Sequence, residues 1–237
     1  AAAFDFIKAV GPVASEPGDT LLSPGPDRLF SIFAHWNFPE AGFETWGEWG
    51  RSEEPLSLRD LLETTHHSRG YTLGLRHTLP AASSARLSIE GEITSLEPSQ
   101  SFRVKQHGEW YASRRVLQGY THRGRVIGAG IGPSGSSQWL AVDWVEPTWN
   151  IGLFGTRIRW ENEALYSYAS EYRRADLTLV AGMRGTGNIG PVRFQVAWAE
   201  SIRLNYMFQT QPLPNDAYRG VDLRNRIMRL SFSVLGS

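Results

Sequence analysis

Apolar and polar residues alternate with a period of two along most of the chain from residue 28 onward. This pattern is typical of β-strands, because successive side chains of a strand point to opposite faces of the sheet. Near the start of the pattern, Phe30, Ile32 and Ala34 share one parity, while Ser31 and His35 occupy the other. The alternation recurs near residues 43–50, 71–79, 86–94, 139–145, 154–161, 177–183, 192–208 and 223–235. The sequence therefore predicts an all-β protein with about nine antiparallel strands, and a short helix around residues 58–63.

The predicted strands are long, and their connections are alternately short and long. About ten residues per strand exceeds the usual ~5–6 of globular sheets and matches the ~9–11 of a tilted transmembrane strand. Short turns are expected at residues 39–42, 80–85, 146–150 and 185–190, whereas a long polar connection spans residues 98–136. Outer-membrane barrels show this asymmetry, with short turns in the periplasm and long loops outside. The pattern favours an antiparallel transmembrane β-barrel in the bacterial outer membrane.

Charged residues recur on the polar parity of the predicted strands. Burying them in a dry core would be costly, whereas a wet barrel lumen accommodates them. We expect a lumenal charge network of Glu44, Glu48, Glu90, Glu92, Arg157, Arg159 and Glu161. Arg76, Arg86 and Arg193 have the parity to join it as ion-pair partners. The alternative is a soluble sandwich or a lipocalin-like barrel, in which the apolar parity would face inward.

Aromatic residues near the strand ends fit the interfacial girdles of a membrane barrel, where amphipathic rings are favoured. The residues concerned are Trp36, Trp49, Tyr71, Trp149 and Trp160. The mean hydropathy of −0.32 is compatible with this interpretation, since lipid-facing and lumen-facing residues average out along each strand. No apolar run approaches the ~20 residues of a membrane-spanning helix.

Composition excludes several classes of function. The 24 basic and 24 acidic residues cancel, so the basic excess that nucleic-acid binding requires is missing, and we expect no nucleic-acid partner. The absence of cysteine excludes disulfides, thiolate metal sites and a cysteine nucleophile. Outer-membrane lipid is the partner that the strand pattern itself predicts.

The sequence divides into a Gly/Pro-rich loop at residues 1–27 and a barrel segment at residues 28–237, with an extracellular loop at 98–136. An odd number of antiparallel strands does not close neatly, and bacterial single-chain barrels are even-numbered. The first residues also lack the basic and apolar regions of a signal peptide. We therefore expect the chain to be the C-terminal portion of a longer barrel, with a missing N-terminal barrel half as a partner.

Motifs for catalysis or cofactor binding are weak. Gly130, Gly132 and Gly135 have the spacing of a dinucleotide-binding loop, but a strand-like run follows instead of a helix. His66 and His67 are adjacent and would point in different directions, which is poor geometry for one metal ion. The glutamate pairs could form a glycosidase site, but same-face carboxylates are also ordinary in a barrel lumen. We expect no catalytic residue, metal or cofactor.

The long connection carries the best candidates for ligand binding. It is rich in glycine, aromatic residues and hydrogen-bond donors, and aromatic faces stack on sugar rings while polar groups bond to hydroxyls. The carbohydrate-binding candidates are Trp110, Tyr111, Tyr120, His122, Arg123, Arg125 and Gln138. The alternative is a loop that folds inward and constricts the barrel, and both can hold together.

The run GYTHRGRVIGAGIGP at residues 119–133, with Trp110 and Tyr111 before it and Gln138 after it, resembles the signature of the Wzi-type capsule assembly family. The runs at residues 42–49 and 70–75 look like strands of that family, and the similarity extends from about residue 27 to the end of the chain. The resemblance implies half of an outer-membrane barrel of about 18 strands. Members carry a periplasmic helical bundle and anchor capsular polysaccharide at the cell surface as lectins, without enzymatic activity.

The predicted function is therefore a non-enzymatic outer-membrane protein of capsule assembly that binds capsular or other surface polysaccharide. A porin or transport channel is the competing possibility, and it requires an open lumen. A lumenal glycoside hydrolase that uses Glu44 or Glu90 is a third.

Overall fold

The computed structural model describes residues 29–52, 58–81, 84–99, 110–111, 119–168, 174–214 and 218–234. The predicted loop at residues 1–27 lies outside the described residues, as do residues 100–109 and 112–118 of the long connection. In the part of the chain that is described, no helix has both the length and the apolar character needed to cross a membrane.

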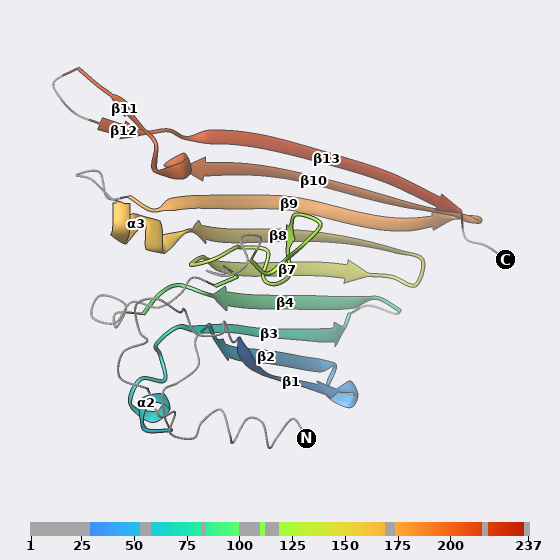
Figure 1. Cartoon of the computed structure of the whole chain (residues 1–237). Coiled ribbons are helices and arrows are strands. Elements are labelled where there is room, and N and C mark those ends of the chain that lie inside the picture. Colours follow the sequence, from blue (N-terminus) through green and yellow to red (C-terminus); the bar gives the residue numbers. More distant parts are fainter. Residues whose placement is uncertain are drawn as a thin grey trace.

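Nine strands form one antiparallel sheet, as Figure 1 shows. They are β1 (Phe30–Phe38), β2 (Phe43–Arg51), β3 (Arg69–Pro80), β4 (Arg86–Ser95), β7 (Ser136–Val145), β8 (Trp149–Trp160), β9 (Asp176–Ile189), β10 (Val192–Leu204) and β13 (Leu223–Val234). Their order in the sheet follows the sequence, from β1 at one edge to β13 at the other. The prediction of an all-β protein with nine long antiparallel strands is confirmed.

The connections are sorted by length between the two ends of the sheet. Short turns join β1 to β2, β3 to β4, β7 to β8 and β9 to β10 at one end, which we call the short-turn end (Figure 1). The connections that leave the opposite, long-connection end contain α2 (Leu58–Glu63), the pair β5 (Thr121–His122) and β6 (Arg125–Val126), α3 (Asn162–Tyr168), and the pair β11 (Thr210–Pro212) and β12 (Tyr218–Gly220). The short helix α2 has the bounds that the sequence predicted.

The turn between β1 and β2 requires a glycine at its end. Residues 39–41 form a single 3-10 turn (η1, Pro39–Ala41) that ends at Gly42 with φ 59°. A Cβ atom on Gly42 would lie 2.2 Å from the carbonyl oxygen of Thr78 on β3. Only glycine combines this left-handed backbone with so close an approach.

The register gives the sheet one apolar face across all nine strands. One row of paired residues runs Phe38, Phe43, His77, Ile89, Val142, Leu153, Met183, Trp198 and Met228. We call the side that carries this row the apolar face. Leu153 is 63% exposed and Met228 is 73% exposed, so these side chains are largely uncovered.

The opposite parity forms the polar face. The row next to the apolar one carries Glu44, Arg76 and Glu90 on β2, β3 and β4. The row on its other side carries Asp143, Gly152 and Arg184 on β7, β8 and β9. These five charged side chains therefore lie on one side of the sheet, in the middle of long strands.

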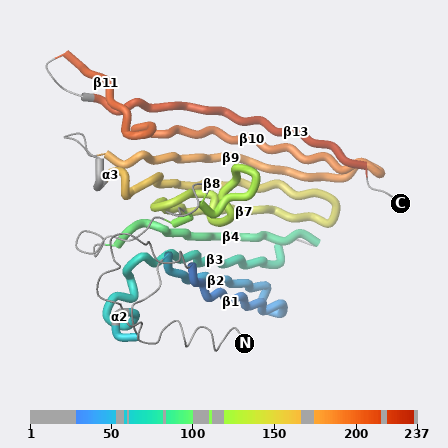
Figure 2. Tube along the Cα trace, in the orientation of Figure 1, coloured from blue at the N-terminus to red at the C-terminus, as the bar shows by residue number. Residues whose placement is uncertain are grey.

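The segment at residues 119–135 lies against the polar face near the long-connection end. Figure 2 draws it as the yellow-green tube that crosses β7 and β8. Its Ile131 packs with Leu96 and Trp110 in a small buried cluster, which Ile158 of β8 also contacts. Because Ile158 has the parity of Phe154 and Thr156, the cluster sits on the polar side of the sheet. Part of the long connection is thus folded over the sheet.

Two predicted boundaries differ from the structure for physical reasons. Residues 185–190 were expected to be a turn, but β9 continues to Ile189 and the turn is confined to residues 190–191. A Cβ atom on Gly187 would lie 2.5 Å from the ring of Phe194 on β10, so this glycine makes room for an aromatic ring. The alternation at residues 192–208 also ends early, because Asn205 takes a left-handed φ of 54° and closes β10.

Candidate functional site

A guanidinium bridges two carboxylates on the polar face. The register places Arg76 of β3 between Glu44 of β2 and Glu90 of β4. Arg76 Nη1 lies 2.9 Å from Glu44 Oε2, and its Nη2 lies 2.8 Å from Glu90 Oε2. His35 Nε2 of β1 is 2.8 Å from the second oxygen of Glu44. Four neighbouring strands are therefore linked by one chain of polar contacts.

A second ion pair spans three strands through a glycine. Arg184 of β9 reaches over Gly152 of β8 to Asp143 of β7, with 2.9 Å from Nε to Oδ1 and 2.6 Å from Nη2 to Oδ2. This two-bond fork is the strongest common geometry for an arginine and a carboxylate. A Cβ atom on Gly152 would lie 1.9 Å from Asp143 Oδ1. The missing side chain at Gly152 is what allows the pair to lie flat on the sheet.

Trp46 also lies over a glycine of the neighbouring strand and bonds to the strand beyond it. Its ring lies over Gly74 of β3, where a Cβ would come within 2.0 Å of the indole. From there its Nε1–H donates to Glu92 Oε2 of β4 at 2.8 Å. The guanidinium of Arg76 lies 6.0 Å from the Trp46 ring centroid, so the aromatic ring also contacts the ion-pair chain.

A groove runs along the polar face between these pairs. Its lining includes Arg76, Glu90, Asp143, Arg184 and Gln195. Both signs of charge face the same space, which is a surface suited to water, ions or hydroxylated ligands.

The structure separates the predicted lumenal charges into two groups. Glu44, Glu48, Glu90 and Glu92 share the polar face. Arg157 and Arg159 lie on the apolar face instead, because the register pairs them with Leu179 and Leu177 of β9, in line with Leu153 and Met183. Arg157 donates to Gln138 at 2.8 Å, and Arg159 lies 3.5 Å from Glu97. Glu161 follows the end of β8 in a left-handed conformation with φ 40°.

The alternation does not identify which face of strand β8 is apolar, because both of its faces carry large apolar residues. Ile151 and Leu153 lie on the apolar face, while Phe154 and Ile158 lie on the polar face. Phe154 stacks on Trp139 at 5.1 Å, and Ile158 packs under the folded connection. Of the other expected partners, Arg193 bonds to Asn188 at 3.2 Å. Arg86 is exposed at the start of β4.

The candidate carbohydrate residues fall into buried anchors and an exposed tip. Trp110 is 8% exposed and belongs to the small cluster with Leu96 and Ile131. The Tyr111 hydroxyl accepts a hydrogen bond of 3.0 Å from the backbone N–H of Ala129. Burial raises the pKa of the Tyr111 phenol, although the Ala129 hydrogen bond acts in the opposite direction. These two aromatic side chains hold the connection in place.

The exposed tip is the hairpin of β5 and β6. Thr121 pairs with Val126 and His122 with Arg125. Between them, Arg123 and Gly124 have φ values of 50° and 75°, as the two central residues of a tight type I′ hairpin turn require. The side chains of His122, Arg123 and Arg125 are exposed.

The remaining two candidates lie apart from the tip. Tyr120 is half-buried, and its backbone N–H donates to the carbonyl of Tyr111 at 2.9 Å. Gln138 is on β7 with the parity of the apolar face, where it accepts from Arg157. Three donors therefore come together at the tip, Trp110 and Tyr111 serve packing, and Tyr120 and Gln138 belong to neither group.

The alternation did not indicate two carboxylates, Asp176 and Glu97, that bind neighbouring segments at the long-connection end. Asp176, nearly fully buried at the start of β9, accepts two bonds from Arg203 at 2.8 and 2.6 Å and a third from the Met207 backbone at 2.8 Å. Glu97 accepts from Ser136 and from Asn162 of α3, the latter at 3.2 Å. Both lie at the ends of predicted strands, where an acidic residue could have drawn attention.

No group of three or more acidic or histidine side chains in the described ranges is arranged to hold a metal ion. Comparisons of the chain with protein-family models, with curated proteins and with solved structures gave no match. The resemblance to the Wzi-type family therefore stays a prediction.

Proposed function

We propose that the chain forms part of the wall of a bacterial outer-membrane β-barrel and binds surface polysaccharide at its long-connection end without catalysing a reaction. The observation that carries the proposal is the division of the sheet into two faces. A row of mostly apolar side chains, exposed at Phe38, Val142, Leu153, Met183 and Met228, spans nine strands. The rows on either side of it carry bonded charges. Lipid outside and water inside would satisfy both faces at once.

The apolar face has the banding expected at a membrane. On β13 the sequence of face residues from the short-turn end is Val234, Phe232, Leu230 and Met228, followed by Arg226 and Arg224. Trp49 pairs with Tyr71 near the long-connection end, and Trp144 pairs with Ile151 close to the short turn. Aromatic rings at both margins of an apolar band are typical of outer-membrane barrels.

The polysaccharide part of the proposal rests on the β5–β6 tip. Its donors are held by a backbone hairpin, and that hairpin is anchored by buried Trp110 and Tyr111. Arginine and histidine donors on a fixed turn can bond to hydroxyl and carboxylate groups of an acidic polysaccharide. The anchoring limits the loss of loop entropy on binding.

The test is polysaccharide binding by the full chain in lipid vesicles. Replacing His122, Arg123 and Arg125 together with alanine should weaken binding at least about tenfold, the equivalent of one or two lost charge-assisted bonds. Arg86→Ala, at the opposite end of the sheet, is the matched control and should bind like the parent. Binding by the triple variant equal to the parent would remove the tip from the site.

The groove on the polar face favours a transport channel as the second candidate. Charges of both signs line it at Glu90, Asp143 and Arg184. Single-channel conductance separates the two functions, because the polysaccharide-binding barrel, with its connection folded over the polar face, should be silent. A hydrolase that uses Glu44 or Glu90 is disfavoured, since each of these carboxylates is bonded to the Arg76 guanidinium.

A further inference from the structure

On the apolar face, arginines mark where the apolar residues end. Arg224 and Arg226 follow Met228 on β13, and Arg157 and Arg159 follow Leu153 on β8. All four lie toward the long-connection end. At the short-turn end, the corresponding positions of this face in the described strands are apolar, including Leu87, Trp144, Trp149, Val192 and Val234. The positive charge is therefore confined to one margin of the apolar band.

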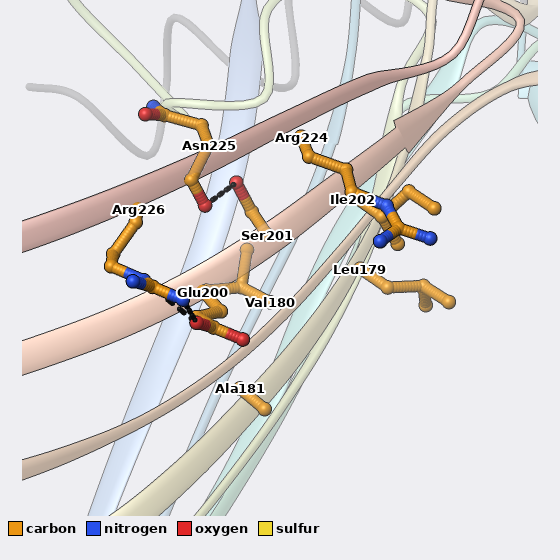
Figure 3. A pocket seen from close by; sticks show the side chains of 9 residues that line it. All are labelled: Leu179, Val180, Ala181, Glu200, Ser201, Ile202, Arg224, Asn225 and Arg226. Carbon is orange, nitrogen blue, oxygen red and sulfur yellow. Dashed lines mark hydrogen bonds and ion pairs between the residues drawn. The ribbon is translucent and has the colours of Figure 1, made fainter.

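A shallow hollow at this margin brings charge and apolar surface together (Figure 3). Leu179, Ala181 and Ile202 supply apolar surface, and Glu200 accepts from Arg226, with 2.8 Å from Nε to Oε1. Arg224 is in register with Ile202, and Figure 3 shows its guanidinium beside Ile202 and Leu179. Within the part of the chain that the structure describes, Arg224 has no carboxylate partner.

We propose that this hollow binds the phosphate group of an outer-leaflet lipid through the Arg224 guanidinium. The inference rests on the proposed function, which places the apolar face in lipid. Two arginines and one glutamate leave a net positive charge, and guanidinium donors match the geometry of a phosphate. The acyl chains of the same lipid would lie along Ile202, Leu179 and the apolar row beyond them.

The position of the hollow, at the long-connection end, indicates that it meets the outer leaflet of the membrane. In outer-membrane barrels the long loops are outside, so a charge at the long-connection end meets the outer leaflet. Arginine at such a margin also places its charge at the headgroup level and its methylenes in the apolar region. Because Arg224 has no carboxylate partner among the described residues, a lipid phosphate is the group that best satisfies it at this depth.

The experiment measures binding of diphosphorylated lipid A, presented in neutral detergent micelles, to the full chain. Arg224→Gln should weaken binding about tenfold, the loss of one charge-assisted contact. Arg224→Lys should fall between the two, because it keeps the charge and loses the fork. Arg229→Gln, on the same strand but on the polar face, is the matched control and should bind like the parent.

Three outcomes overturn the inference: unchanged binding by Arg224→Gln, equal weakening by Arg229→Gln, or equal binding of dephosphorylated lipid A. Inorganic phosphate is a separate arm, and Arg224-dependent binding of it at the same strength would assign a free anion rather than a lipid. Insertion of each variant into lipid vesicles is measured in parallel. If the parent inserts and Arg224→Gln still binds normally, only this inference fails; if the parent does not insert, the proposed function fails as well.

Discussion

The two faces of the nine-stranded sheet use the same strands but satisfy their side chains in different ways. On the polar face, side chains bond to one another across strands, as in the Glu44–Arg76–Glu90 bridge and the Asp143–Arg184 fork. On the apolar face, residues such as Leu153 and Met228 lie exposed. The polar face is therefore largely satisfied within the protein, whereas the apolar face depends on what surrounds it.

Glycine has a distinct role on the polar face. Gly74 and Gly152 lie under Trp46 and under the Asp143–Arg184 pair, so that long side chains cross a strand at close range. Removing the side chain from one strand lets its two neighbours contact each other. The Trp46–Glu92 bond and the Asp143–Arg184 fork thus each join two strands that have another strand between them.

The largest expected effect comes from placing a charge on the apolar face. Leu153→Arg should lower the free energy of unfolding in lipid vesicles by about 2–4 kcal/mol, because arginine at mid-bilayer is costly. Gln195→Arg, on the polar face of β10, should change it by less than about 1 kcal/mol. Urea unfolding of both variants in the same vesicles checks the difference. Equal costs at the two positions would remove the distinction between the faces.

The next effect breaks a cross-strand pair through its glycine. Gly152→Ala places a Cβ atom 1.9 Å from the present position of Asp143 Oδ1, so the fork with Arg184 must open. We expect a loss of about 1–3 kcal/mol, the cost of leaving bonded charged groups unpaired. Gly155→Ala on the same strand is the control, because its Cβ would lie 3.6 Å from the nearest atom. A control as destabilised as Gly152→Ala would point to strand propensity instead.

A smaller effect is expected at Arg76. Its side chain is 43% exposed, so solvent screens the pairs with Glu44 and Glu90. Arg76→Gln should lower the free energy of unfolding by about 1 kcal/mol. Adding Glu90→Gln should recover part of that loss, since one unpaired carboxylate is removed. Additive losses in this double-mutant cycle would show that the two side chains are not coupled.

The smallest effect concerns pH and the anchored connection. Burial raises the pKa of Tyr111, so the folded state keeps the phenol neutral where the unfolded chain ionises. Its contribution to stability is complete below pH about 10, the ordinary tyrosine value, and is lost as pH rises through the higher folded pKa. Tyr111→Phe should remove this part of the alkaline dependence. The difference between the phenolate absorbance titrations of the two proteins isolates Tyr111, and a difference curve with its midpoint at the ordinary tyrosine value would contradict the burial of Tyr111.

The sequence predicted the sheet well because alternation is a local property. Apolar residues of one parity run from Val192 to Trp198 and, after Glu200, continue at Ile202 and Leu204, which is enough to identify β10 and its two faces. The prediction was weaker where both parities carry large residues, as in β8, and there Arg157 and Arg159 were placed on the wrong face. Their face depends on the pairing partner, which lies tens of residues away.

The candidate site was less predictable than the sheet. The Asp143–Arg184 fork joins residues 41 positions apart and requires a glycine on the strand between them, a relation that no local pattern contains. Aromatic residues in a glycine-rich loop likewise fit two roles. Trp110 and Tyr111 could bind sugar or anchor the loop, and only the buried cluster with Leu96 and Ile131 distinguishes these.

The central claim is that the apolar face contacts lipid and the polar face contacts water. The chain contains no cysteine, so single cysteines can be introduced for nitroxide labels without background. Labels at Gln195, Val196, Ala197 and Trp198 of β10, in lipid vesicles, would be probed with oxygen and with a water-soluble nickel chelate. We predict that oxygen collides more with labels at positions 196 and 198, and the chelate with those at 195 and 197. Chelate access equal at all four positions, or the reverse alternation, would contradict the account.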